Sequence, residues 1–137
     1  MDSIDGGFSG GMTRGMPFDW KSYFVLAQYL AESVPPGCSP EAAKRSAISR
    51  AYYAAFGEAR RYAEARLGFQ RTGQVEDHRR LRECFVQKGG KWKEVAMDLN
   101  RLRSLRNACD YEDEVSDLSS TTCFALQMAA RLMQSCR

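Results

Sequence analysis

Histidine is almost absent from this sequence of 137 residues, because His78 is the only one. The five cysteines are odd in number, and no two of them form a Cys-x-x-Cys pair. A zinc centre or a disulfide framework requires more ligands or more regular cysteine spacing than this. The sequence therefore predicts no metal site and no cofactor, and it predicts free thiols that serve as small core residues.

Long hydrophobic runs are also lacking. No apolar run approaches the ~18 residues that a membrane-spanning helix requires, and no signal peptide opens the chain. These absences predict a cytoplasmic protein without a membrane partner. The composition, with 44% hydrophobic and 27% charged residues, is ordinary for a folded protein and excludes a wholly disordered chain.

Sustained apolar–polar alternation is missing as well, so we expect no strands. Apolar residues instead recur every three or four positions in segments that end at proline or glycine. The expected helices cover about 19–34, 39–67, 75–88, 91–111 and 118–132. The short connections between them favour an all-α, antiparallel up-and-down bundle of four to five helices. Residues 1–16 are expected to be a flexible Gly/Ser-rich tail, and 17–137 to form one helical domain.

Charge is unevenly distributed along the chain. Residues 44–106 hold 16 basic and 7 acidic side chains, whereas 107–118 hold five acids and no base. A basic segment of this kind favours a polyanionic partner, and the acidic segment favours a basic partner or a self-contact. The alternative is a mixed-sign helical surface without a specific ligand.

Arg50 stands alone as a charge within the small and apolar residues 46–56. On a helix it shares a stripe with Ala43, Ala47 and Ala54, and small side chains allow a neighbouring helix to approach closely. We therefore expect this stripe to form part of a two-fold dimer interface. Arg50 itself either pairs with an acid in the core or lines a functional cleft, because an unpaired buried charge is costly.

A second group of polar residues follows late in the chain. Arg106 and Asp110 are four positions apart, as are Asn107 and Tyr111, so each pair shares a helix face. Such a set could bind a phosphate through Arg106, orient a sugar through Asn107 and Asp110, and stack a base on Tyr111. The alternative is a simple i,i+4 ion pair beside a half-buried tyrosine. Asp110 is also the acid that we expect to pair with Arg50.

The segments Ser-Arg-Ala-Tyr-Tyr-Ala-Ala-Phe at 49–56 and Arg-Asn-x-x-Asp-Tyr at 106–111 resemble two motifs of one branch of the HEPN family. His78 resembles that family's intervening histidine. Residues 41–133 therefore resemble a HEPN domain. The resemblance implies a helical bundle that dimerises and brings the late motif of each subunit into one cleft. It also implies that Arg106 binds phosphate with Asn107 beside it.

Many HEPN domains are metal-independent ribonucleases of toxin–antitoxin, CRISPR-associated or antiphage systems, and others bind nucleotides without cleavage. Several are encoded beside a minimal nucleotidyltransferase, so the resemblance implies RNA, a nucleotide or a nucleotidyltransferase antitoxin as partner. Active members carry a histidine four to six residues after the late arginine. The corresponding positions here are Tyr111, Glu112 and Asp113.

Because none of these three positions holds a histidine, three functions remain open. In a ribonuclease toxin, Arg106 would hold the phosphate while Asp110 or Tyr111 assists proton transfer, or His78 substitutes from another helix. In a catalytically degenerate module, Arg106, Asn107, Arg50 and His78 would bind RNA or a nucleotide without cleavage. In a structural adaptor, the acidic loop 110–117 would be the interaction surface.

Overall fold

The computed structural model describes residues 16–137, and within them the chain forms five α-helices and no strand. The helices are α1 (Lys21–Glu32), α2 (Pro40–Arg66), α3 (Asp77–Lys88), α4 (Trp92–Tyr111) and α5 (Leu118–Ser135). The predicted all-α fold is therefore confirmed, and each expected helix is present within a few residues of its expected bounds. The expected tail lies outside the described residues, apart from Met16.

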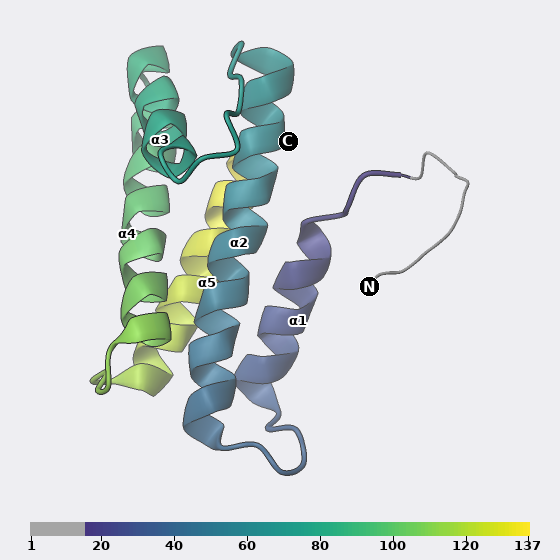
Figure 1. Ribbon diagram of the computed structural model, residues 1–137, viewed down its shortest axis with the longest axis vertical. Helices are drawn as coiled ribbons and strands as arrows, with labels where there is room; N and C mark the ends of the chain where they lie inside the picture. Colours follow the sequence, from purple (N-terminus) through teal and green to yellow (C-terminus); the bar gives the residue numbers. More distant parts are fainter. Residues whose placement is uncertain (1–15) are drawn as a thin grey trace.

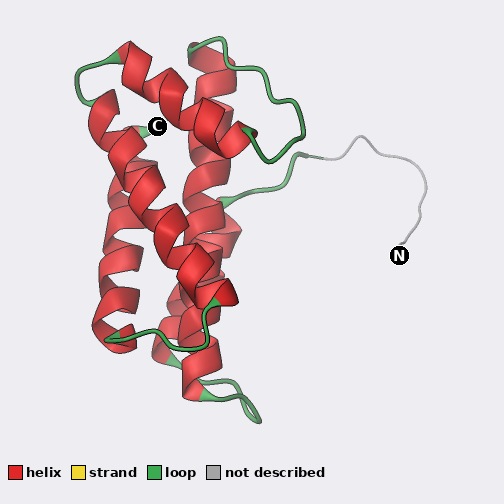
Figure 2. Cartoon of the chain, turned by 60° about the vertical axis from the view of Figure 1, so that its left-hand side comes forward, coloured by secondary structure: helices red, strands yellow, loops and turns green. Residues whose placement is uncertain are grey.

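The longest helix, α2, lies at the centre of the bundle (Figure 1). It packs against α1, α4 and α5, whereas α3 packs mainly on α4. In Figure 1, α1 and α4 flank α2 and α5 lies behind it. Figure 2 shows the loops that join the helix ends, the longest of which, residues 67–76, leads from α2 to α3. One face of α2 therefore lies between α1, α3 and α4.

The start of α2 follows from local side-chain chemistry. Ser39 precedes the helix in an extended conformation, and its Oγ accepts a hydrogen bond of 2.9 Å from the backbone N–H of Ala42. Pro40 occupies the first helical position, where its missing N–H would have had no intrahelical partner. The helix start predicted from Ser39-Pro40-Glu41 is confirmed.

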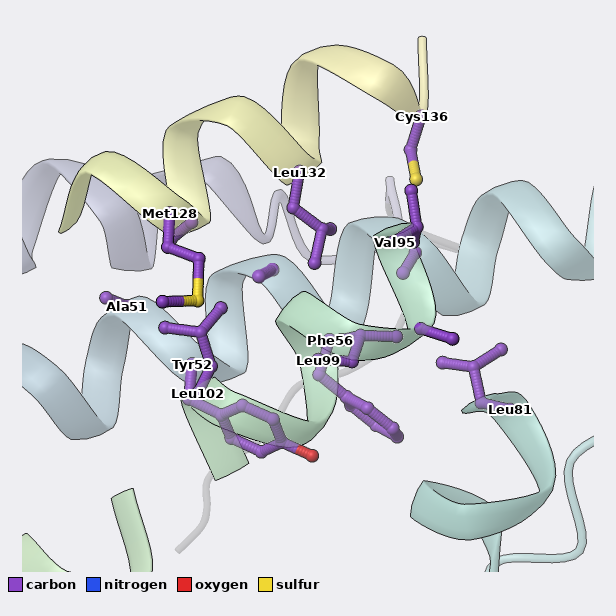
Figure 3. Close-up of a cluster of buried hydrophobic side chains, with 14 of the residues drawn as sticks. Ala51, Tyr52, Phe56, Leu81, Val95, Leu99, Leu102, Met128, Leu132 and Cys136 are labelled. Atoms are coloured by element: carbon purple, nitrogen blue, oxygen red, sulfur yellow. The ribbon is translucent and has the colours of Figure 1, made fainter. Parts of the chain in front are cut away.

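The apolar core lies where α2, α4 and α5 meet (Figure 3). Buried there are Val95, Leu99 and Leu102 of α4, and Thr122, Ala125, Ala129 and Leu132 of α5. Tyr52 of α2 is buried with them, but in Figure 3 its hydroxyl leaves the cluster on the side away from α5. Tyr52 thus joins the core to the face of α2 beside α3. All five cysteines are free, and Cys109 and Cys136 are buried in the core as expected. Cys84 is partly buried, and the expectation of a core position was wrong for Cys38 and Cys123, which are exposed.

The alanine stripe of α2 does not form a surface. Ala43, Ala47 and Ala54 are all buried within the single chain by the helices around α2. The expectation that this stripe forms a dimer interface was therefore wrong, because close helix packing inside the bundle already uses it. A homodimer remains a prediction that would require another surface.

Gly57 of α2 makes room for the indole of Trp20. A Cβ added at Gly57 would lie 2.2 Å from a ring carbon of Trp20. We expect Gly57→Ala to lower the free energy of unfolding by about 1–3 kcal/mol, the usual cost of overpacking. In a Trp20→Ala background the same change should instead raise stability, because alanine is the better helix former by ~1 kcal/mol. Urea unfolding measures both, and a stabilising Gly57→Ala in the otherwise unchanged chain would contradict this packing.

Asp77 fixes the start of α3 and thereby the place of His78. Its carboxylate accepts hydrogen bonds from the backbone N–H of Thr72 (2.9 Å), the Thr72 hydroxyl (2.7 Å) and the N–H of Gly73 (3.0 Å). Arg80 adds an ion pair of 2.9 Å. Burial acts to raise the pKa of Asp77, but these hydrogen bonds outweigh it and lower the pKa to about 2. The loop before α3 is thus tied to an ionised carboxylate.

Candidate functional site

Arginine and aromatic side chains meet along the face of α2 that lies between α1 and α4. The guanidinium carbon of Arg106, from α4, lies 5.3 Å from the ring centroid of Tyr53 and 5.6 Å from that of Tyr52. The guanidinium carbon of Arg50 lies 5.2 Å from the centroid of Tyr53 and 4.8 Å from that of Tyr23. Contacts of this kind attract the cation to the ring face. The early and late motifs therefore share one site.

Arg106 is the most deeply placed charge of this site, with only 8% of its surface exposed. Its Nη1 donates to Oδ2 of Asp110 at 3.4 Å, so the expected i,i+4 ion pair is present. Its Nε is buried and has no hydrogen-bond partner among residues 16–137, and the Nε of Arg103, one turn earlier, is in the same state. Buried donors without partners are rare in proteins. The Nε of Arg60 in α2 is in the same state within the described residues.

His78 of α3 lies against the same aromatic residues. Its Nδ1 and the hydroxyl of Tyr52 share a hydrogen bond, and its ring stacks on Phe56 with centroids 4.3 Å apart. Tyr52 thus contacts both His78 and the guanidinium of Arg106. The structure therefore brings the sequence-predicted residues His78 and Arg106 into contact with the same tyrosine.

The positive charges of three arginines act on His78. They are Arg82 of α3 and Arg103 and Arg106 of α4, and we call them the arginine cluster. Burial lowers the pKa of His78, and the charges of Arg103, Arg106 and Arg82 lower it further, to about 4. The imidazole is therefore neutral at pH 7. Among residues 16–137, neither Arg82 nor Arg103 has a carboxylate oxygen within 4.0 Å. Within this part of the chain, Arg106 is paired with Asp110, whereas Arg82 and Arg103 have no carboxylate partner.

The expected ion pair between Arg50 and Asp110 was wrong. No such pair forms, and the two residues are linked only through Ser49, to whose Oγ Arg50 donates at 3.3 Å. The Ser49 hydroxyl in turn donates to Oδ2 of Asp110 at 3.4 Å. The reason is that Tyr23 and Tyr53 hold the guanidinium of Arg50, while Arg106 pairs with the carboxylate.

The remaining late-motif residues differ in their closeness to the cluster. Asp110 contacts Arg106 and has 32% of its side chain exposed. Asn107 is half-buried one position after Arg106. Tyr111 is 75% exposed, and within the described chain its side chain forms no hydrogen bond and no aromatic pair. The structure therefore groups Arg106 with Asp110 and leaves Tyr111 directed to solvent.

Arg45 is a residue of this region that sequence reasoning missed. Its guanidinium donates to the carbonyl oxygens of Cys109 (3.0 Å), Glu112 (2.6 Å) and Asp113 (3.0 Å). It also donates to the carboxylate of Glu41 at 3.0 Å. Basic side chains commonly bind the free carbonyls at helix ends. Arg45 thus holds the end of α4, the helix that carries the late motif.

Arg82, Arg103 and Tyr52 were also not assigned a role from sequence. A signal existed for the two arginines, because Arg82 follows His78 by four positions and Arg103 precedes Arg106 by three. Both spacings place the side chains on one helix face. The link through Tyr52 depends on how α2, α3 and α4 pack, and no spacing along the chain reveals it.

The chain matches no protein-family model, no curated protein and no solved structure. Among residues 16–137, His, Cys, Asp and Glu side chains nowhere gather in groups of three that could hold a metal ion. In the same part of the chain, no helix combines the length and the apolar character needed to cross a membrane. The fold and this arginine-rich site are therefore the grounds on which a function is inferred.

Proposed function

We propose that this chain is a HEPN-type, RNA-targeting protein: an antiparallel up-and-down bundle that acts in the cytoplasm as a homodimer and cleaves RNA without a metal ion. In this role it would be a ribonuclease toxin of a toxin–antitoxin or antiphage system, with a nucleotidyltransferase as candidate antitoxin. The observation that supports the proposal best is the buried Arg106 together with Arg103 and Arg82, which form no ion pair with a carboxylate of residues 16–137.

This arrangement suits the binding of an RNA phosphate. The planar guanidinium of Arg106 can form two charge-assisted hydrogen bonds to one phosphate group. Arg82 and Arg103 add positive charge, which attracts a polyanion from solution and strengthens its binding. Asn107, half-buried and adjacent to Arg106 in the sequence, would contact the adjoining sugar.

Cleavage requires two proton transfers at this site. The ribose 2′-hydroxyl loses a proton as its oxygen attacks phosphorus, and the leaving 5′-oxygen takes up a proton. The products are a 2′,3′-cyclic phosphate and a 5′-hydroxyl. We assign Asp110, which contacts Arg106, as the base that takes the 2′-hydroxyl proton. We assign His78, which contacts the same tyrosine as Arg106, as the acid that gives a proton to the 5′-oxygen.

A second candidate function is RNA or nucleotide binding without cleavage. Specific observations favour it. His78, with a pKa of about 4, is a weak base at neutral pH, and Asp110 is engaged by both Arg106 and Ser49. The positions at which active HEPN members carry a histidine hold Tyr111, Glu112 and Asp113. The module would then hold RNA or its nucleotidyltransferase partner at the same site.

The decisive test combines RNA cleavage with expression toxicity. We expect the purified chain to cleave single-stranded RNA in the presence of EDTA and to leave 2′,3′-cyclic phosphate ends. We also expect its expression to arrest growth, whereas Arg106→Ala should do neither. RNA bound but intact would favour the second candidate. Cleavage that disappears in EDTA and returns with Mg²⁺ would contradict the proposed mechanism and indicate a contaminating nuclease.

A further inference from the structure

The only histidine of the chain lies among more positive than negative charges. The titratable and charged groups around it come from three helices: Tyr52 and Tyr53 of α2, Asp77 and Arg82 of α3, and Arg103 and Arg106 of α4. Arg82, Arg103 and Arg106 oppose a positive charge on the ring, whereas Asp77 favours one. That carboxylate is already bound by Thr72, Gly73 and Arg80.

We propose that binding of an RNA phosphate at the arginine cluster is coupled to protonation of His78, so that guanidinium groups and an imidazolium hold the phosphate together. The inference rests on the proposed function and deepens it, because it gives the same site a dependence on pH. It also supplies a protonated group beside the leaving 5′-oxygen of a bound substrate.

The coupling arises because a bound phosphate attracts an imidazolium that the arginine cluster alone would repel. In the free protein, burial and the arginine cluster keep the imidazole neutral, with a pKa of about 4. A phosphate bound to Arg103 and Arg106 places negative charge close to the ring and offsets that repulsion. The coupling is reciprocal by thermodynamic necessity, so an anion that favours protonation is itself bound more tightly by the protonated protein.

Tyr52 makes this change of charge compatible with the packing. Burial raises the pKa of the Tyr52 phenol above its ordinary value, so the hydroxyl keeps its proton. A phenol can donate to a bare Nδ1 of His78 or, after rotation, accept from Nδ1–H. The hydrogen bond between the two residues can therefore persist when the ring is protonated, while Nε2–H becomes a charge-assisted donor.

The coupling determines the direction in which the affinity for a phosphate changes with pH. Between the pKa of His78 in the free protein, about 4, and its higher value in the complex, the complex carries more protons than the free protein. Affinity therefore rises as the pH falls through the pKa of the complex, and the rise ends near the pKa of the free protein. One coupled proton gives an increase of at most about tenfold per pH unit.

Because His78 is unique, its ring proton signals in an NMR spectrum of the untagged full-length chain report this one residue. The probe is a 2′-O-methyl oligouridylate, which cannot be cleaved through a 2′-hydroxyl and whose bases and phosphodiesters do not titrate between pH 4 and 8. We expect the titration midpoint of His78 to move upward by at least about one pH unit when the probe is bound. The dissociation constant should fall by about tenfold for one pH unit within the coupled range.

Two variants locate the effect. Arg106→Ala should abolish the movement of the His78 midpoint, and His78→Gln should remove the pH dependence of binding. A midpoint that stays unchanged while the probe binds would overturn the coupling and leave the proposed function intact. A probe that does not bind at any pH would overturn the proposed function itself, and the coupling with it. A shift that persists in Arg106→Ala would overturn the location of the bound phosphate.

Discussion

Replacing Arg106 by alanine is expected to weaken the binding of single-stranded RNA by at least about tenfold, which corresponds to ~1.4 kcal/mol. Arg106 is the buried cation of the site, and its Nε lacks a partner within the described part of the chain. Its loss removes two charge-assisted hydrogen bonds to a phosphate and one contribution to counterion release. The slope of the logarithm of affinity against the logarithm of salt concentration should therefore fall by about one. Fluorescence anisotropy at several salt concentrations measures both quantities.

Two variants sharpen this experiment. Arg106→Lys should recover only part of the affinity, because an ammonium group is a point charge and lacks the planar fork. Arg101→Ala removes the same charge from the same helix, but Arg101 lies near Asp98 and away from the cluster, so it should change affinity little. Circular dichroism and unfolding curves show whether each variant is folded. If folded Arg106→Ala bound RNA as tightly as the unchanged chain, Arg106 would be a structural residue.

The helices could be predicted because their boundaries depend on neighbouring residues. Ser39 and Pro40 begin α2 through a side-chain cap and a fixed backbone angle, both of which act within one turn. Gly89, with φ of +78°, follows the last residue of α3 in a conformation that suits glycine. Each signal lies within a few residues of the boundary that it sets, so the sequence alone contains it.

The contacts of the site could be predicted only in part, because they depend on how helices distant in sequence pack. The Arg106–Asp110 pair was visible from its spacing, since both residues lie on α4. Arg50 could pair with a carboxylate or contact aromatic rings. Tyr23 of α1 lies near it only when the bundle has formed. Arg45 likewise binds carbonyl groups that are more than sixty positions away.

The alanine stripe illustrates the same limit. Small residues at helical spacing indicate that another helix approaches closely, but they do not show whether that helix belongs to the same chain. The central position of α2, with α1, α4 and α5 packed against it, uses the stripe inside the monomer. The pattern was interpreted correctly as close packing and wrongly as a surface between subunits.

Outside the site, the largest loss of stability is expected when Asp98 of α4 loses Arg131 of α5. Asp98 is 1% exposed, and Arg131 donates to its two carboxylate oxygens from Nη2 at 3.1 Å and from Nε at 3.3 Å. The side chain of Arg131 is itself 58% exposed, so solvent screens its charge and the attraction alone contributes little. The large loss of stability comes from the burial of the Asp98 carboxylate, because a buried charge without its partner is strongly unfavourable.

We therefore expect Arg131→Met, which keeps most of the apolar stem, to lower the free energy of unfolding by about 3 kcal/mol. This is the low end of the range for a broken buried pair, because Arg101 remains 3.6 Å from Asp98. Arg101→Met is the matched control, since it removes an exposed arginine from the same carboxylate and should cost less than about 1 kcal/mol. The double variant Asp98→Leu/Arg131→Met should regain most of the loss, because no buried charge is left without a partner. Urea unfolding of the four proteins measures these differences. Equal losses for Arg131→Met and Arg101→Met would show that Asp98 does not depend on its bond to α5.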